Sequence, residues 1–95
     1  MFILSLTYKR PPEEADHHMQ PHLDWVKDGY AKGWFLASGR KVPRTGGVIL
    51  AKGCERAEIE AFVATDPFTL HDIADYEITE LAVTTVVDGL EELRG

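Results

Sequence analysis

Two ionisable residues, His22 and Asp66, could together move a proton to and from a small molecule. An imidazole changes its protonation state near neutral pH, and a carboxylate bonded to it fixes the tautomer and raises its basicity. Elimination and isomerisation are reactions that such a pair can catalyse. A structural explanation stays open for each residue: His22 as a core histidine bonded to a backbone carbonyl, and Asp66 as a capping or turn residue of its Asp-Pro step.

Two predicted helices place these residues on faces that are otherwise apolar. The stretch 13–32 has apolar residues at helical steps of three and four, namely Ala15, Met19, Leu23, Val26 and Tyr30. His22 falls within this stripe. A second helix is predicted over 55–65, and Asp66 comes four residues after Phe62, where the apolar face ends. Because a carboxylate is costly to bury without a partner, two helices on one sheet could pair His22 with Asp66.

Strand patterns complete the fold prediction. Alternating or β-branched residues predict four strands, at 2–8, 34–42, 48–52 and 76–87. The order β-α-β-β-α-β predicts an α+β ferredoxin-like fold, with a four-stranded antiparallel sheet and two helices on one face. The domain is expected to span 1–87, with a C-terminal tail at 88–95. In the first helix, Pro21 lacks a backbone donor and predicts a kink or a looser first turn.

The second face of this sheet predicts self-association. Ile3, Leu36 and Leu81 would lie there, and they are too apolar to be left in water. A chain of 95 residues also buries only a modest share of its surface, so a second copy would stabilise it. We therefore expect a homodimer.

Charge and composition argue against several other partners. A net charge of −6 disfavours a nucleic-acid partner, because neutralising phosphates requires clustered Lys and Arg. No apolar run approaches the roughly 20 residues that cross a bilayer, so no membrane partner is expected. The single cysteine, Cys54, cannot form an intrachain disulfide, which favours a reducing compartment and predicts a cytoplasmic location.

Four further residues are candidates for binding a small-molecule ligand. Ser38 and Gly39 close the second predicted strand, where a hydroxyl and backbone amides can bond to a ligand or to the chain. Arg40 and Arg44 could hold the ligand if it is anionic, and an ordinary turn is the alternative for the loop around Arg44.

His18 lies one helical turn before His22, and it could form a hydrogen bond at the edge of a pocket or lie on the surface. The spacing is also one that metal ligands use, and Asp66 would complete a two-histidine, one-carboxylate set of the non-haem iron type. Such pairs of histidines are common by chance, and the H-E-x-x-H motif is absent. We therefore predict no metal and no cofactor.

The chain resembles the YciI-like (YCII-related) proteins over about residues 1–82. The resemblance rests on the order and spacing of several segments, namely His18-x3-His22, Gly29-Tyr30, Phe35-Leu36-Ala37-Ser38-Gly39, Pro43-Arg44-Thr45-Gly46-Gly47, Asp66-Pro67-Phe68 and Tyr76-Glu77-Ile78. It implies a dimeric α+β barrel whose pocket is centred on a histidine and an aspartate, here His22 and Asp66. Two positions depart from the family pattern: Met19 replaces a frequent arginine, and Arg40 replaces a frequent proline.

The resemblance also implies a range of activities. Most members have no assigned reaction, some relatives are dehydrochlorinases of chlorinated hydroquinones, and the wider superfamily includes muconolactone isomerases and small monooxygenases. The main hypothesis is a cofactor-independent enzyme of the lyase or isomerase type, in which His22 is the general acid/base and Asp66 its partner. The alternative is a non-catalytic dimeric domain that binds a small molecule or regulates a partner.

Overall fold

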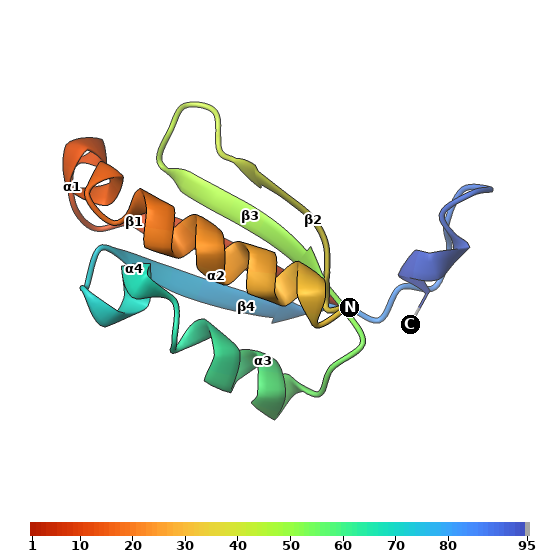
Figure 1. The fold of residues 1–95 in the computed structure, drawn as a ribbon. Helices are drawn as coiled ribbons and strands as arrows, with labels where there is room; N and C mark the ends of the chain where they lie inside the picture. Colours follow the sequence, from red (N-terminus) through yellow and green to blue (C-terminus); the bar gives the residue numbers. More distant parts are fainter. Residues whose placement is uncertain (95) are drawn as a thin grey trace.

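The computed structural model describes residues 1–94 and has the predicted element order (Figure 1). Its strands are β1 (Phe2–Tyr8), β2 (Phe35–Arg40), β3 (Gly46–Ala51) and β4 (Ala74–Glu80). Its helices are α1 (Pro12–Asp16), α2 (Met19–Ala31), α3 (Arg56–Val63), α4 (Pro67–Leu70) and the short 3-10 helix η1 (Glu91–Leu93). All strand pairs are antiparallel in the order β2-β3-β1-β4, which confirms the ferredoxin-like α+β prediction.

The central strand β1 defines which face of the sheet is covered. Phe2, Leu4 and Leu6 alternate with less buried residues along β1, and each is almost fully buried. Leu4 pairs with Ile49 on β3 and with Ile78 on β4, so these side chains share one face. Burying a leucine of this kind contributes about 2 kcal/mol to stability.

The helices lie on that same face. In Figure 1, α2 lies across the middle of the sheet and α3 beside it, toward the β4 edge. The Trp25 indole joins the two helices, because its N–H donates to the Phe62 carbonyl and to the Thr65 hydroxyl at 3.1 Å each. Gly29 lets α2 approach β2 closely, since a Cβ at this position would lie 2.2 Å from the ring of Phe35.

The first helical stretch is divided differently from the prediction. The break lies at residues 17–18, between α1 and α2, and no kink is needed at Pro21. Pro21 is the third residue of α2, within the first turn, where backbone N–H groups have no intrahelical acceptor. The expected looser start of the helix is therefore a separate short helix and a turn.

The last strand is shorter than predicted. It begins at Ala74 and ends at Glu80, although β-branched residues continue to Val87. Glu80 pairs with Phe2, the first residue of β1, so the sheet offers no further partner strand. Leu81 alone extends the pairing by one residue: its N–H donates to the Met1 carbonyl at 2.8 Å, and its carbonyl accepts from the Met1 amino group at 3.1 Å.

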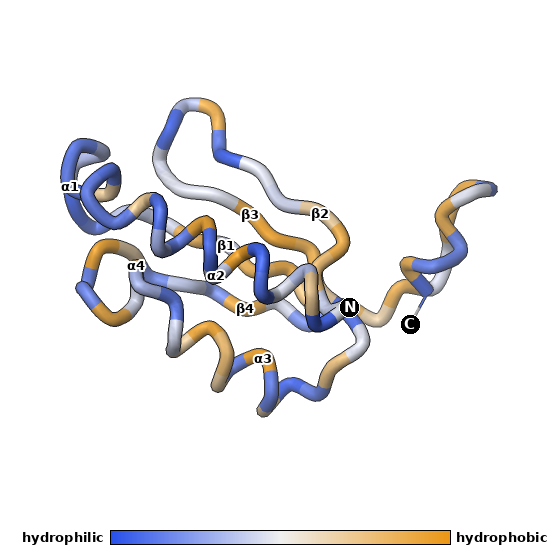
Figure 2. Tube along the Cα trace, in the orientation of Figure 1, coloured by the Kyte–Doolittle hydropathy of each residue, from blue (hydrophilic) through white to orange (hydrophobic). Residues whose placement is uncertain are grey.

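The chain after β4 leaves the sheet near the N-terminus and extends away from the other elements (Figure 1). Lys52, the residue that follows β3, bonds to the carbonyl of Glu92 in this segment. Figure 2 shows that hydropathy alternates along the segment, whereas α1 is mainly hydrophilic. Within residues 1–94, no helix has the length and hydrophobicity needed to cross a membrane.

Candidate active site

Asp66 starts the short helix α4 and is completely buried. Its Oδ1 accepts a hydrogen bond of 2.9 Å from the N–H of Phe68, so it is an N-cap residue. Pro67 follows at the first helical position, where proline is favoured, and it keeps Asp66 in an extended conformation (φ −60°, ψ 129°). The Asp-Pro step therefore fixes both the backbone and the carboxylate.

His22 bonds to this buried carboxylate. Its Nδ1 lies 2.9 Å from Oδ1 and 3.0 Å from Oδ2 of Asp66. An ionised carboxylate can only accept hydrogen bonds, so with Asp66 ionised Nδ1 would be the donor and Nε2 of a neutral ring would keep its lone pair. The two explanations that the sequence leaves open for Asp66 are thus both realised, since it caps α4 and bonds His22.

Stacking fixes the plane of the His22 ring. The ring lies parallel to that of Phe68, with centroids 4.1 Å apart and an angle of 5° between the planes. The His22 side chain is 11% exposed. The helix α2, the carboxylate and the aromatic ring together hold one orientation of the imidazole.

Tyr76 is a third member of this cluster. Its hydroxyl donates to Oδ2 of Asp66 at 2.5 Å. Burial, and then the adjacent carboxylate, raise the pKa of Tyr76, so the phenol remains protonated and keeps donating. Asp66 therefore receives bonds from a backbone amide, an imidazole and a phenol.

Tyr76 was not selected as a site residue from the sequence. Its strand position carries the signal, because it pairs with Leu6 and so lies on the covered face of the sheet. A buried tyrosine usually needs a partner for its hydroxyl, which Asp66 provides.

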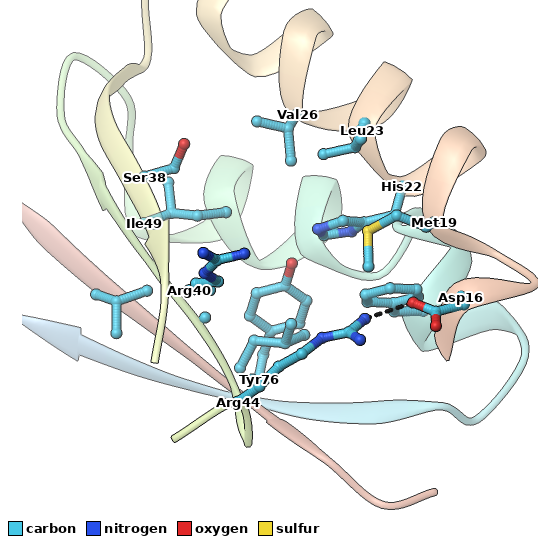
Figure 3. Close-up of a pocket in the computed structure, with 16 residues that line it drawn as sticks. Asp16, Met19, His22, Leu23, Val26, Ser38, Arg40, Arg44, Ile49 and Tyr76 are labelled. Atoms are coloured by element: carbon cyan, nitrogen blue, oxygen red, sulfur yellow. Dashed lines mark hydrogen bonds and ion pairs between the residues drawn. The ribbon is translucent and has the colours of Figure 1, made fainter. Parts of the chain in front are cut away.

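A cavity of about 580 Å³ lies beside this cluster. The His22 ring and Tyr76 form part of its wall, and the nitrogen edge of the ring faces its interior (Figure 3). No residue of the described part of the chain bonds Nε2 of His22. Asp66 lies behind the wall and is shielded from solvent.

The predicted ligand-binding residues lie in different places around the cavity. Four of them line it, namely Ser38, Gly39, Arg40 and Arg44. The Ser38 hydroxyl lies 2.8 Å from the hydroxyl of Tyr30. The Arg44 guanidinium donates to Asp16 at 2.5 Å, and this ion pair lowers the pKa of the Asp16 carboxyl.

His18 lies apart from this cavity. It is the N-cap residue of α2, and its ring stacks on that of His71 with centroids 4.1 Å apart. Both rings line a separate depression together with Arg10 and His17. In the part of the chain that the structure describes, no three His, Cys, Asp or Glu side chains are grouped so that they could bind a metal ion.

The arrangement of His22, Asp66 and Tyr76 is suited to proton transfer. The carboxylate holds Nδ1, so the basic nitrogen is directed at a ligand in the cavity. When Nε2 takes a proton, the buried negative charge stabilises the imidazolium that forms.

Comparison with known proteins identifies the family. The YCII-related domain model matches residues 1–82, and the chain therefore belongs to the YciI-like family. Among solved structures it is similar to 5-chloro-2-hydroxyhydroquinone dehydrochlorinase from Burkholderia phenoliruptrix AC1100, in complex with 2,5-dihydroxybenzoquinone. The two chains are 18% identical with a TM-score of 0.69, over 85% of this chain and 93% of the other. At this identity the likeness shows the fold. No curated protein matches the sequence.

Proposed function

We propose that this protein is a cofactor-independent enzyme that uses His22 and Asp66 for acid/base chemistry on a small oxygenated compound. The observation that carries the proposal is the bond from Nδ1 of His22 to the buried Asp66, in a ring that also borders a cavity. A core histidine with a purely structural role can bond to a backbone carbonyl and has no need of a buried carboxylate, which is costly to desolvate. The cost is consistent with an ionisable pair kept for function.

The proposed reaction begins with transfer of a substrate proton to Nε2 of His22. In an elimination, the electron pair of the broken C–H or O–H bond forms a new π bond, and the leaving group departs with the electrons of its own bond. In an isomerisation, the same proton returns to a different carbon. Asp66 stays ionised throughout and stabilises the imidazolium, while Tyr76 holds Asp66 in place.

A planar, oxygen-rich ring is the substrate class that we propose. The dehydrochlorinase of similar fold has 2,5-dihydroxybenzoquinone bound, and it is named for its action on 5-chloro-2-hydroxyhydroquinone. The cavity volume of about 580 Å³ is ample for one such ring. Ser38, Gly39, Arg40 and Arg44 are the proposed ligand-binding residues, and His18 would take part only from outside the cavity.

We also propose that the protein is a homodimer that pairs through the open face of its sheet. Ile3 lies opposite Leu50 and Thr79 on neighbouring strands, on the face away from the helices, and Ile3 and Leu50 are half-buried. Covering these residues with a second copy would remove apolar surface from water. Of the other residues expected on this face, Leu36 lies at a β-bulge and Leu81 lies beyond the end of β4.

Replacing His22 tests the catalytic proposal. Turnover can be screened as chloride release from chlorinated hydroxyhydroquinones and as ring opening or isomerisation of small lactones. For a compound that the protein converts, His22→Gln is expected to reduce kcat about 100- to 10,000-fold, because it removes the general base. His18→Gln is the matched control and should leave kcat within about twofold. Equal turnover by the His22→Gln variant and the wild type would contradict the proposal.

One observation favours a second candidate, a non-catalytic domain that binds a small molecule or regulates a partner. Asp66 caps α4 and accepts from Tyr76 as well as from His22, so its burial also has a structural use. If the wild type converts none of the screened compounds, and His22→Gln lowers the affinity for a compound that the wild type binds, this second candidate is favoured.

A further inference from the structure

The cavity beside His22 has walls of two different kinds. Toward α2 it is lined by Met19, Leu23 and Val26, which cannot ionise. On the strand side Arg40 and Arg44 extend toward the same space, from β2 and from the loop before β3 (Figure 3). Asp16, the ion-pair partner of Arg44, also lines the cavity, so Arg40 supplies the positive charge opposite the apolar side chains of α2.

The two arginines differ in their partners. Arg44 is 2.5 Å from a carboxylate oxygen of Asp16, so its charge is already paired. Among residues 1–94, Arg40 has no carboxylate within ion-pair distance. A guanidinium remains charged at any physiological pH, and one without an internal partner stays available to an anion in the cavity.

The strand register directs Arg40 to the covered side of the sheet. Arg40 pairs with Gly47, and Ser38 pairs with Ile49, whose side chain belongs to the core. Gly47 has no side chain, and a Cβ there would approach the carbonyl oxygen of Gly39 to 2.9 Å. The glycine therefore allows the close approach of β2 and β3 beside Arg40.

We propose that Arg40 binds an anionic oxygen group of the substrate, either a carboxylate or an ionised hydroxyl on a small planar ring. The inference rests on the proposed function, because it concerns the ligand of the same cavity. The planar guanidinium donates two parallel hydrogen bonds to a carboxylate, and it can also bind a single phenolate or enolate oxygen. The ring of the ligand would then pack against the apolar side chains of α2, with its reacting atoms near His22.

Binding of three probe compounds tests this inference without any turnover. Benzoate and benzamide have nearly the same shape and differ in charge, and 2,5-dihydroxybenzoquinone supplies acidic hydroxyls instead of a carboxylate. In NMR titrations we expect the wild type to bind benzoate, the quinone or both about tenfold more tightly than benzamide. Arg40→Gln should remove that preference and leave benzamide binding unchanged. The probe that loses affinity identifies the anionic group as a carboxylate or as an ionised hydroxyl.

Lys41→Gln provides the matched control for charge. Lys41 is the next residue in the chain, but its ammonium bonds to the hydroxyl of Thr7. This variant should keep every affinity within about twofold of the wild type. The inference is overturned if the wild type does not prefer either anion to benzamide, if no probe binds, or if Arg40→Gln and Lys41→Gln lose equal affinity.

The same titration of His22→Ala separates this inference from the proposed function. The anion preference should persist in His22→Ala, because Arg40 and not His22 provides the charge. Loss of the preference in Arg40→Gln together with turnover that is independent of His22 would contradict the proposed function alone. Turnover that needs His22, in a protein without any anion preference, would contradict the inference alone.

Discussion

His18 and His22 are four residues apart, and the structure gives them different environments. His22 lies within α2, is 11% exposed in its side chain and bonds to Asp66, a residue 44 positions further along the chain. His18 precedes the first residue of α2 and stacks on the exposed His71. The difference shows that a histidine's chemical environment is set by what the rest of the fold brings to it.

The break between α1 and α2 causes much of this difference. The metal hypothesis assumes that His18 and His22 lie on one continuous helix, so that both side chains share a face. His18 instead has φ −114° and ψ 9°, outside the helical conformation, and its ring lies against α4 and not in the cavity. The four-residue spacing of His18 and His22 therefore does not bring their rings together, because no continuous helix runs through both residues.

The largest expected effect on stability comes from removing Asp66, the buried carboxylate that bonds His22 and for which His18 has no counterpart. Asp66→Ala should lower the free energy of unfolding by about 3–5 kcal/mol, because the Phe68 amide, the Tyr76 hydroxyl and His22 each lose a buried acceptor. Chemical denaturation measures this change. The control is Asp75→Ala, an exposed carboxylate on β4 whose loss should change stability by less than about 0.5 kcal/mol. Similar losses of stability in Asp66→Ala and Asp75→Ala would contradict the claim that the buried carboxylate of Asp66 stabilises the fold.

Tyr76→Phe should lower the free energy of unfolding by a smaller amount, about 1–2 kcal/mol at neutral pH, because one hydrogen bond to Asp66 is lost. The effect should depend on pH. Burial and the Asp66 carboxylate raise the pKa of Tyr76, so the folded protein keeps the phenolic proton where the unfolded chain loses it. This contribution is fully present below the ordinary tyrosine pKa of about 10 and is lost as the pH rises above it.

The predicted loss of stability with rising pH can be tested directly in alkaline buffer. Above about pH 10, the wild type should lose about 1.4 kcal/mol more per pH unit than Tyr76→Phe, until the folded phenol also ionises. Urea unfolding at several pH values between neutral and alkaline conditions measures the difference. Parallel pH profiles for the two proteins would show that Tyr76 is not a buried donor to Asp66.

The smallest effect on stability is expected from removing the His18 ring. His18→Ala removes a half-buried ring that stacks on the exposed His71, and it should change the free energy of unfolding by less than about 0.5 kcal/mol. Thermal and urea unfolding both report this change. A loss comparable to that of Asp66→Ala would mean that the His18–His71 contact matters more than its exposure indicates.

The sequence predicts the fold because its strand alternation and its helical stripes indicate the same buried face of the sheet. Phe2, Leu4 and Leu6 alternate as a half-buried strand must, and the helical stripes carry the residues that pack on them. The contact between His22 and Asp66 is also foreseeable, since both follow apolar faces that must cover the same sheet.

Other features depend on tertiary contacts that a single segment does not encode. Tyr76 resembles any aromatic core residue in a strand, and only the position of Asp66 gives its hydroxyl a role. The end of β4 is set by the start of β1, not by the β-branched residues that follow Glu80. The ion pair of Arg44 with Asp16 likewise joins the loop before β3 to the end of α1, and the approach of these two segments has no local signal.

The tautomer of His22 tests the central claim most directly. Nitrogen-15 NMR of the histidine rings, in buffer at about pH 9 where free imidazole is neutral, reports which ring nitrogen carries the proton. We predict that His22 is protonated at Nδ1 and bare at Nε2, and that Asp66→Ala abolishes this preference while His18 is unchanged. If His22 instead carries its proton on Nε2, or ignores the loss of Asp66, then the carboxylate does not orient the imidazole and the proposed general base is contradicted.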